Sequence, residues 1–221
     1  MDAMFEMAYN ALSDSVYCYD NGQGDILDIE RFEDLGLDCE FGASRMAIIM
    51  DDYVLKKAYD GFCEDKYDDE GMPYVDCWLN EETQNSCELE AELYAIAVEE
   101  GVGQFFAKTE YIGNCIFKQE RADELVAWTT NDYVPPEEIE AKAEECGLDD
   151  LLARSSVYVV RYLMEEYTVE ELKKLQDFLN RYDIDDLHAH NAGWVKGKLK
   201  FIDYVGTNDT TSEMVEARKE I

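Results

Sequence analysis

Apolar and polar positions alternate in two different ways along this chain, and the change falls near residue 122. Before that point the apolar runs are short and are separated by turn residues, which is typical of strands. Two runs, Met46 to Met50 and Tyr53 to Tyr59, flank Asp51-Asp52 and predict a β-hairpin. Two further strands are expected on either side of Gly113-Asn114.

Beyond residue 122 apolar side chains return at helical spacing, so this half of the chain is expected to be mostly helical. One helix is closed by Gly147, and another is opened by a capping box at Thr168 to Glu171. Residues 194–202 instead predict a short hairpin around a Lys-Gly-Lys turn. Together with two helices that precede residue 122, the expected helices are residues 2–12, 83–100, 135–146, 149–167 and 168–180.

Two stretches have a less regular pattern. Residues 64–84 are strongly acidic and include Asp68-Asp69-Glu70-Gly71, so we expect an exposed insertion or a linker there. Residues 16–29 contain two short apolar runs around Asn21 to Gly24, which fits either a small hairpin or a tethering arm.

The charge of the chain restricts its partners. Its 221 residues include 52 acidic and 19 basic side chains, for a formal net charge of −33. Such a field repels nucleic-acid phosphates and anionic membranes, and it favours a basic partner. No apolar run is long enough to span a bilayer, and the start of the sequence lacks the basic residues of a signal peptide. We therefore expect a cytoplasmic protein without a membrane segment.

The seven cysteines are scattered, odd in number and without the close pairs of a zinc site. This pattern favours free thiols in a reducing compartment.

The chemistry of the chain is concentrated near its end. Asp186 and Asn191 stand five residues apart in a polar loop, and Asp203 follows a short hairpin twelve residues after Asn191. Asn and Asp oxygens are hard ligands that suit magnesium, while a further carboxylate can orient a hydroxyl group or water. Polar hairpins also occur without any chemistry, because Asp and Asn are common loop residues.

This arrangement resembles the catalytic loop and metal-binding strand of the protein kinase-like superfamily, in which Asp-x-x-x-x-Asn precedes Asp-Phe-Gly. The stretch Asp186-Leu187-His188-Ala189-His190-Asn191-Ala192-Gly193 is similar, more narrowly, to the loop of small kinase-like proteins of tailed bacteriophages. The resemblance covers roughly residues 35–206.

The resemblance implies an α+β fold: an antiparallel β N-lobe with one helix, followed by a truncated, mostly helical C-lobe. The implied domains are an N-terminal extension at residues 1–34, the N-lobe at 35–122 and the C-lobe at 123–221.

The resemblance also implies ATP and Mg²⁺ as ligands. Asp186 would be the catalytic carboxylate, and Lys56 would contact phosphate while paired with Glu88 of the helix near residue 90. Lys57 and Glu92 are the second choices for this pair, since a strand lysine or a helix glutamate is often merely solvated. Magnesium would be held by Asn191 and Asp203.

The nucleotide would further contact the turn and hinge residues of the N-lobe, namely Gly42, Ser44, Glu120 and Ala122. The turn departs from a Gly-rich loop, because only Gly36 and Gly42 are near it and Asp38 and Glu40 would repel phosphate. His188 and His190 are expected to orient the backbone or cover the nucleotide.

Other departures concern the acceptor side. Ile184 and Asp185 replace a His and an Arg that are common in kinases, and Asp203-Tyr204-Val205-Gly206 only approximates Asp-Phe-Gly. The fifteen residues after Gly206 leave no room for an activation segment or peptide-binding helices. The acceptor is therefore expected to be a small molecule, a group supplied by a bound partner, or absent.

Three functions follow from these patterns. The first is a minimal Mg-ATP-dependent phosphotransferase, acting in the bacterial host cytoplasm if the chain is phage-encoded. The second is a pseudokinase that binds a basic host or virion protein. The third is an acidic mimic of DNA that occupies a DNA-binding protein.

Overall fold

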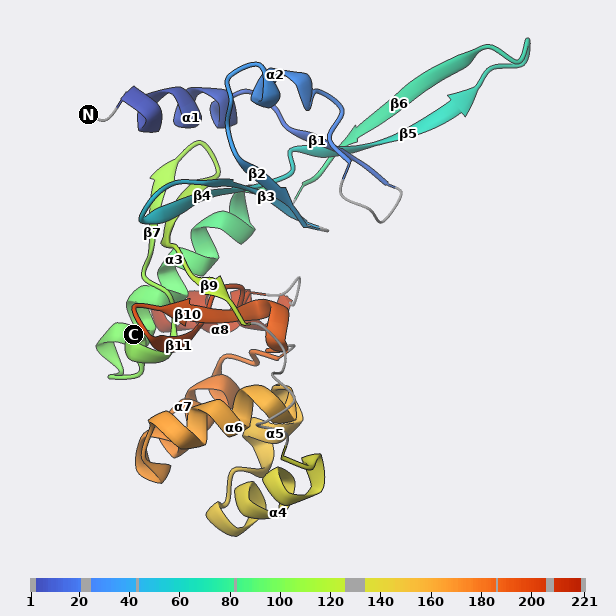
Figure 1. Cartoon of the computed structure of the whole chain (residues 1–221). Coiled ribbons are helices and arrows are strands. Elements are labelled where there is room, and N and C mark those ends of the chain that lie inside the picture. The colour runs from blue at the N-terminus through green and yellow to red at the C-terminus, as the bar shows by residue number, and fades with distance from the viewer. Residues whose placement is uncertain are drawn as a thin grey trace. The chain divides into compact units, whose positions relative to one another are not determined.

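The computed structural model describes residues 3–20, 25–42, 44–81, 83–125, 134–185, 187–205 and 209–219, with the side chains of 83–86, 124, 209 and 210 excepted. The chain divides into two units, one of residues Met1–Ala91 with Thr109–Arg121 and one of Glu92–Lys108 with Ala122–Ile221. Both contain helices and mainly antiparallel sheets, so the α+β class is confirmed (Figure 1).

The main sheet of the first unit is antiparallel and has the strand order β2-β3-β4-β8-β7. Ile49 pairs with Val54 across the acidic turn, which confirms the expected hairpin. The Gly113-Asn114 turn is confirmed as well, and both residues have positive φ, 97° and 54°. The strands are β2 (Cys39–Phe41), β3 (Arg45–Ile49), β4 (Tyr53–Ala58), β7 (Thr109–Gly113) and β8 (Ile116–Glu120).

The N-terminal residues belong to the core of this unit. The expected first helix is confirmed as α1 (Ala3–Ser13), and its Ala8 and Leu12 are buried in one cluster with Leu55 of β4. The short α2 (Glu30–Glu33) adds Phe32 to the same cluster. The stretch before residue 35 is therefore packed against the sheet, because its apolar side chains share one core with those of β3 and β4.

The acidic stretch after residue 60 is a hairpin and not a linker. β5 (Gly61–Tyr67) and β6 (Pro73–Leu79) pair along their whole length, and β1 (Tyr17–Tyr19) joins β5 in parallel at Gly61 to Cys63. Aromatic and β-branched residues between the carboxylates give the segment its strand character. The next helix, α3 (Thr83–Glu99), is confirmed close to its expected bounds.

The expectation of seven free thiols is wrong. Cys63 and Cys77 stand directly opposite each other in the hairpin and form a disulfide, while five cysteines remain free. Sequence spacing did not show this pair, because the strand register brings together residues separated by 14 positions. Burial raises the pKa of the free Cys39 and Cys87 thiols to about 11, so both are protonated at pH 7.

The second unit contains four consecutive helices, α4 (Pro136–Cys146), α5 (Asp149–Arg154), α6 (Val157–Glu166) and α7 (Val169–Arg181). The single helix expected over residues 149–167 is wrong, since Ser155 and Ser156 are extended and separate α5 from α6. The physical reason is a long-range bridge: Ser155 Oγ and Ser156 N both donate to Leu187 O. The end of α4 at Gly147, with φ 71°, and the capping box of α7 are confirmed.

A small sheet completes this unit, with the order β11-β10-β9. Its strands are β9 (Asp123–Glu124), β10 (Ala192–Val195) and β11 (Lys198–Phe201), and short 3-10 turns, η1 (Gly103–Phe105) and η2 (Ala189–Asn191), adjoin it. The C-terminal residues add α8 (Asp209–Lys219), whose Arg218 pairs with Glu99 and Glu100. Among the described residues, no helix has the length and apolarity that crossing a membrane requires.

Candidate nucleotide- and metal-binding residues

The backbones of the two expected magnesium ligands lie near each other at the open end of the β10–β11 hairpin. The hairpin closes through Lys196 and Gly197, whose φ values of 53° and 77° are those of a tight two-residue turn. Ile202 N donates to Asn191 O at 2.9 Å, which continues the ladder beyond the strands. Asn191 therefore lies opposite Ile202 and within one residue of Asp203, although twelve residues separate the two in sequence.

Asn191 and Asp203 are both half-buried, and their backbones stand at the same end of the hairpin. Hard oxygens of this kind are the ligands that magnesium takes, usually with water and phosphate oxygens completing its shell. A group of three or more His, Cys, Asp or Glu side chains suited to a metal is not found among the described residues. Asp186 lies outside them, so its expected catalytic role stays a prediction.

The loop around Asp186 is fixed on both sides by Arg154, a residue that sequence reasoning missed. The Arg154 guanidinium donates to Asp183 Oδ1 at 3.2 Å and to Ile184 O at 3.0 Å. On the far side, Leu187 N donates to Arg154 O at 3.0 Å. Asp183 adopts a positive φ of 50°, and its bond to Arg154 supports this backbone turn.

Of the two histidines of the loop, His188 is seen to orient the backbone, while the expected role of His190 stays a prediction. His188 Nδ1 accepts a hydrogen bond from His190 N at 3.2 Å and so caps η2, which leads into Asn191. The two rings lie 5.7 Å apart with an interplanar angle of 75°. This arrangement agrees with a backbone-orienting role for His188.

Gly193, two positions after Asn191, has no room for a side chain. A Cβ on Gly193 would lie 2.8 Å from both Ala122 Cβ and Asp123 O, distances that real Cβ atoms do not show. The glycine therefore allows β9 to pair with β10, and this pairing fixes the chain just after the expected hinge.

The strand lysines of β4 point to opposite sides of the sheet, as the alternation predicted. Lys57 is buried: its Nζ donates to Leu12 O at 2.8 Å and to Asp14 O at 3.1 Å, and it pairs with Asp60 at 2.7 Å. These contacts hold the end of α1, so Lys57 is a structural residue. Lys56 is half-buried and shares its face with Ala58, whose N–H contacts Cys87 Sγ of α3. Lys56 therefore remains the candidate phosphate contact.

The helix carboxylate that sequence reasoning missed is Glu90. Glu90 is fully buried, forms an ion pair with Arg45 of β3 and accepts a hydrogen bond from Gln119 Nε2 at 3.0 Å. It occupies the α3 stripe formed by Cys87, Leu93 and Ala97, and a charged residue at an apolar position was the signal that could have identified it.

The two expected helix carboxylates have different surroundings. Glu88 is half-buried near Tyr111, whose pKa is raised by burial and, to a smaller extent, by the Glu88 charge. The pairing of Lys56 with Glu88 stays a prediction. Glu92, the second choice, pairs with Lys219 of α8 at 2.9 Å.

The turn expected to cradle phosphate is occupied by internal hydrogen bonds. Gly42 N donates to Arg45 O at 2.8 Å, and the Gly42 and Ser44 carbonyls accept from the Tyr59 hydroxyl and the Tyr59 N–H. Ala43, between them, lies outside the described residues. The Gly42 amide is therefore engaged and not directed at a ligand, which is a departure from a phosphate-binding Gly-rich loop.

The expected hinge spans the boundary between the units. Glu120 ends β8 opposite Tyr53, and the second unit resumes at Ala122, directly after Arg121 of the first.

Comparison of the chain with protein-family models, curated proteins and solved structures finds no match in any of the three. The resemblance to the kinase-like superfamily stays a prediction.

Proposed function

We propose that this chain is a kinase-like protein that binds ATP with Mg²⁺ and retains phosphotransfer chemistry. The observation that carries the proposal is the β10–β11 hairpin, which brings Asn191 next to Asp203. Asn191 and Asp203 would hold the magnesium, which neutralises charge on the nucleotide phosphates. Lys56 would contact phosphate, and Asp186 would orient the acceptor hydroxyl.

The fixed geometry of the loop supports this reading. Positioning residues raise reaction rates only when they are held close to the productive arrangement. Arg154 bonds the backbone before and after Asp186, and His188 caps the turn that carries Asn191. These two supports hold the neighbours of Asp186 and the turn of Asn191 in place, as a catalytic loop requires.

A catalytically inactive pseudokinase is the second candidate. The Gly42 amide is engaged by Arg45 O, and the buried Glu90 carboxylate is committed to Arg45 and Gln119. The first engages an amide that could bind phosphate. The second engages a helix carboxylate that could otherwise hold a phosphate-contacting lysine. A binding module or an acidic DNA mimic would then use the surface and its charge rather than a nucleotide site.

The test is calorimetric titration of the chain with ATP, once at a fixed concentration of free Mg²⁺ and once in excess EDTA. Magnesium must be constant because a chain of charge −33 is stabilised by divalent cations through screening alone. The variant is Asp203→Asn, and its matched control is Asp177→Asn on the exposed face of α7. The proposal predicts binding that needs magnesium, weakens at least tenfold in Asp203→Asn and is unchanged in the control.

Thermal melts provide a second readout. Ligand at about 100 times its dissociation constant adds about 2.7 kcal/mol to the free energy of unfolding. ADP release above background that is lost in Asp186→Asn, with binding retained, would support phosphotransfer. Binding without release favours the pseudokinase, and no binding at millimolar ATP refutes the nucleotide proposal.

A further inference from the structure

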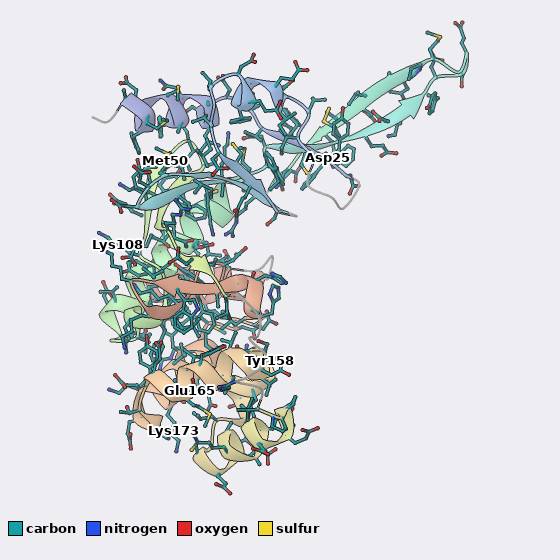
Figure 2. All side chains as sticks on the ribbon, in the orientation of Figure 1. Asp25, Met50, Lys108, Tyr158, Glu165 and Lys173 are labelled. Atoms are coloured by element: carbon teal, nitrogen blue, oxygen red, sulfur yellow. A yellow bond between two sulfur atoms is a disulfide. The ribbon has the colours of Figure 1, made fainter. Side chains whose placement is uncertain are left out.

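Exposed apolar side chains are concentrated on the β5–β6 hairpin. Tyr67, Met72 and Leu79 are 71%, 60% and 70% exposed, and Tyr74, Val75 and Trp78 are also exposed. In the described residues, most of the large hydrophobic side chains that face solvent lie in this one segment. Figure 2 shows side chains standing out from both strands of the hairpin. Large apolar patches on a surface mark interaction sites.

The strand register divides these residues between two faces. On one face Phe62 pairs with Trp78, and Phe62 packs against Tyr59 of the core. On the other face, which we call the outer face, Leu79, the disulfide, Val75 and Tyr67 follow one another along the hairpin. The outer face is thus an apolar stripe in which Asp65 is the only charged side chain.

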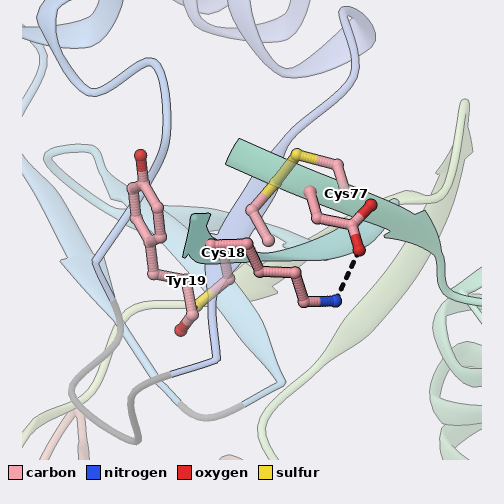
Figure 3. Close-up of a disulfide and its surroundings, with 6 residues drawn as sticks. Cys18, Tyr19 and Cys77 are labelled. Atoms are coloured by element: carbon pink, nitrogen blue, oxygen red, sulfur yellow. Dashed lines mark hydrogen bonds and ion pairs between the residues drawn. A yellow bond between two sulfur atoms is a disulfide. The ribbon is translucent and has the colours of Figure 1, made fainter. Parts of the chain in front are cut away.

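The base of the outer face is continued by β1. Tyr17 and Tyr19 pair with Gly61 and Cys63 and so lie on the same side of the sheet. The Tyr17 ring covers Gly61, where an added Cβ would lie 2.5 Å from a ring carbon. Figure 3 shows Tyr19 beside the disulfide. Aromatic side chains at this position extend the stripe towards the body of the unit.

The hairpin is held rigid although only part of it is packed. The Cys63–Cys77 disulfide links the strands, and Lys66 pairs with Asp76 at 2.5 Å on the opposite face. At the tip, Asp68 Oδ1 accepts hydrogen bonds from Glu70 N and Met72 N at 2.9 and 2.8 Å. A surface held in one conformation loses little entropy on binding.

The charge of the hairpin indicates what can cover it. Residues 61–79 contain six carboxylates and one lysine, a net charge of −5, and three of the carboxylates are consecutive at the tip. A second copy of this chain would bring the same negative field, and nucleic acid would bring phosphates. A protein with apolar side chains ringed by Lys and Arg is complementary in both respects.

We propose that the outer face of the β5–β6 hairpin docks a basic protein, with the stripe from Leu79 to Tyr67 buried at the centre and the tip carboxylates paired at the rim. This surface does not depend on nucleotide binding.

The test uses a library of random 15-residue peptides displayed on phage and selected against the full chain at 150 mM NaCl. Each round is counter-selected against the double variant Val75→Ser/Leu79→Ser, which has the same net charge. Peptides held only by the acidic field are removed by this step. The proposal predicts enriched peptides that combine Lys or Arg with aromatic or aliphatic residues.

The affinity of an enriched peptide is then measured on four proteins. It should fall at least tenfold for Val75→Ser/Leu79→Ser and stay unchanged for Leu35→Ser/Met214→Ser, which alters two exposed apolar residues elsewhere. Asp69→Asn/Glu70→Gln should weaken binding more at low salt than at high salt. Thermal melts verify that each variant is folded, which is expected because the substituted side chains are exposed.

Three outcomes would overturn the proposal. The first is that no peptide distinguishes the wild-type chain from Val75→Ser/Leu79→Ser. The second is that discriminating peptides carry no net positive charge. The third is that the wild-type chain dimerises in sedimentation velocity while this double variant does not, since a second copy would then be the occupant.

Discussion

Arg45 and Glu90 form a buried ion pair within a polar network that also contains Gln119 and Thr109. Glu90 is fully buried, and Arg45 is 8% exposed. Removing one member of a buried pair leaves the other charge in a medium of low dielectric constant, which costs more than the pair itself contributes. This network is therefore a sensitive point of the first unit.

We predict that Glu90→Gln lowers the free energy of unfolding by about 3–5 kcal/mol, because the Arg45 guanidinium loses the buried carboxylate. Urea denaturation measures the change. Glu92→Gln, two residues along the same helix, removes a partner from an exposed pair with Lys219 and should cost at most about 1 kcal/mol. The double variant Arg45→Met/Glu90→Leu should cost less than the sum of its single changes. Equal losses for Glu90→Gln and Glu92→Gln would contradict the prediction.

For single residues, the sequence predicted side-chain direction within a strand but not the partners that distant segments supply. Alternation along β4 was enough to separate Lys56 from Lys57, because side-chain direction in a strand has a period of two. The partner of Glu90 could not be predicted, since Arg45 is 45 positions away and becomes a neighbour only through the sheet. The same holds for Arg154 and the loop around Asp186.

At the scale of elements, local signals predicted most helix ends and most turns. The capping box of α7 lies within four residues: Thr168 Oγ1 accepts from Glu171 N at 3.3 Å, and the Glu171 carboxylate accepts from Thr168 N at 2.9 Å. The bonds that this carboxylate accepts from Thr168 N and Thr168 Oγ1 lower the pKa of Glu171. The break between α5 and α6 was missed because the bonds that cause it come from Leu187, 32 positions away.

The two N-caps on either side of α6 offer a matched comparison. Thr168→Ala removes a cap bond and should lower the free energy of unfolding by about 1 kcal/mol. Ser156 occupies the corresponding place before α6, but its buried Oγ has no hydrogen-bond partner in the described part of the chain. Ser156→Ala should therefore be neutral or slightly stabilising. A larger loss for Ser156→Ala than for Thr168→Ala, in the same chemical denaturation, would show that this reading of the caps is wrong.

At the scale of the whole molecule, the net charge of −33 opposes folding through self-repulsion. The exposed carboxylates of Glu144 and Glu145 lie in the last turn of α4, where negative charge also opposes the helix dipole. Exposed Glu140 adds a like charge one turn before Glu144. The cytoplasmic location remains a prediction, and the Cys63–Cys77 disulfide removes the free-thiol pattern as a reason for it.

We predict that the melting temperature rises with NaCl between about 10 and 300 mM, because the Debye length falls from about 30 Å to less than 8 Å. The triple variant Glu140→Gln/Glu144→Gln/Glu145→Gln should melt about 2–4 °C higher than the wild type at low salt. That advantage should shrink at high salt, and scanning calorimetry at both salt concentrations measures it. A constant advantage would point to helix propensity instead of charge.

The strand order of the main sheet has a consequence for synthesis on the ribosome. β4 pairs with β3 on one side and with β8 on the other, and β8 is made about sixty residues later. At about 5–20 residues per second, the nascent chain carries the open edge of β4 for several seconds. An edge of this kind invites pairing with other chains. A transcript truncated before residue 109 would therefore yield a polypeptide that aggregates or is degraded, since the strand that closes its sheet is never made.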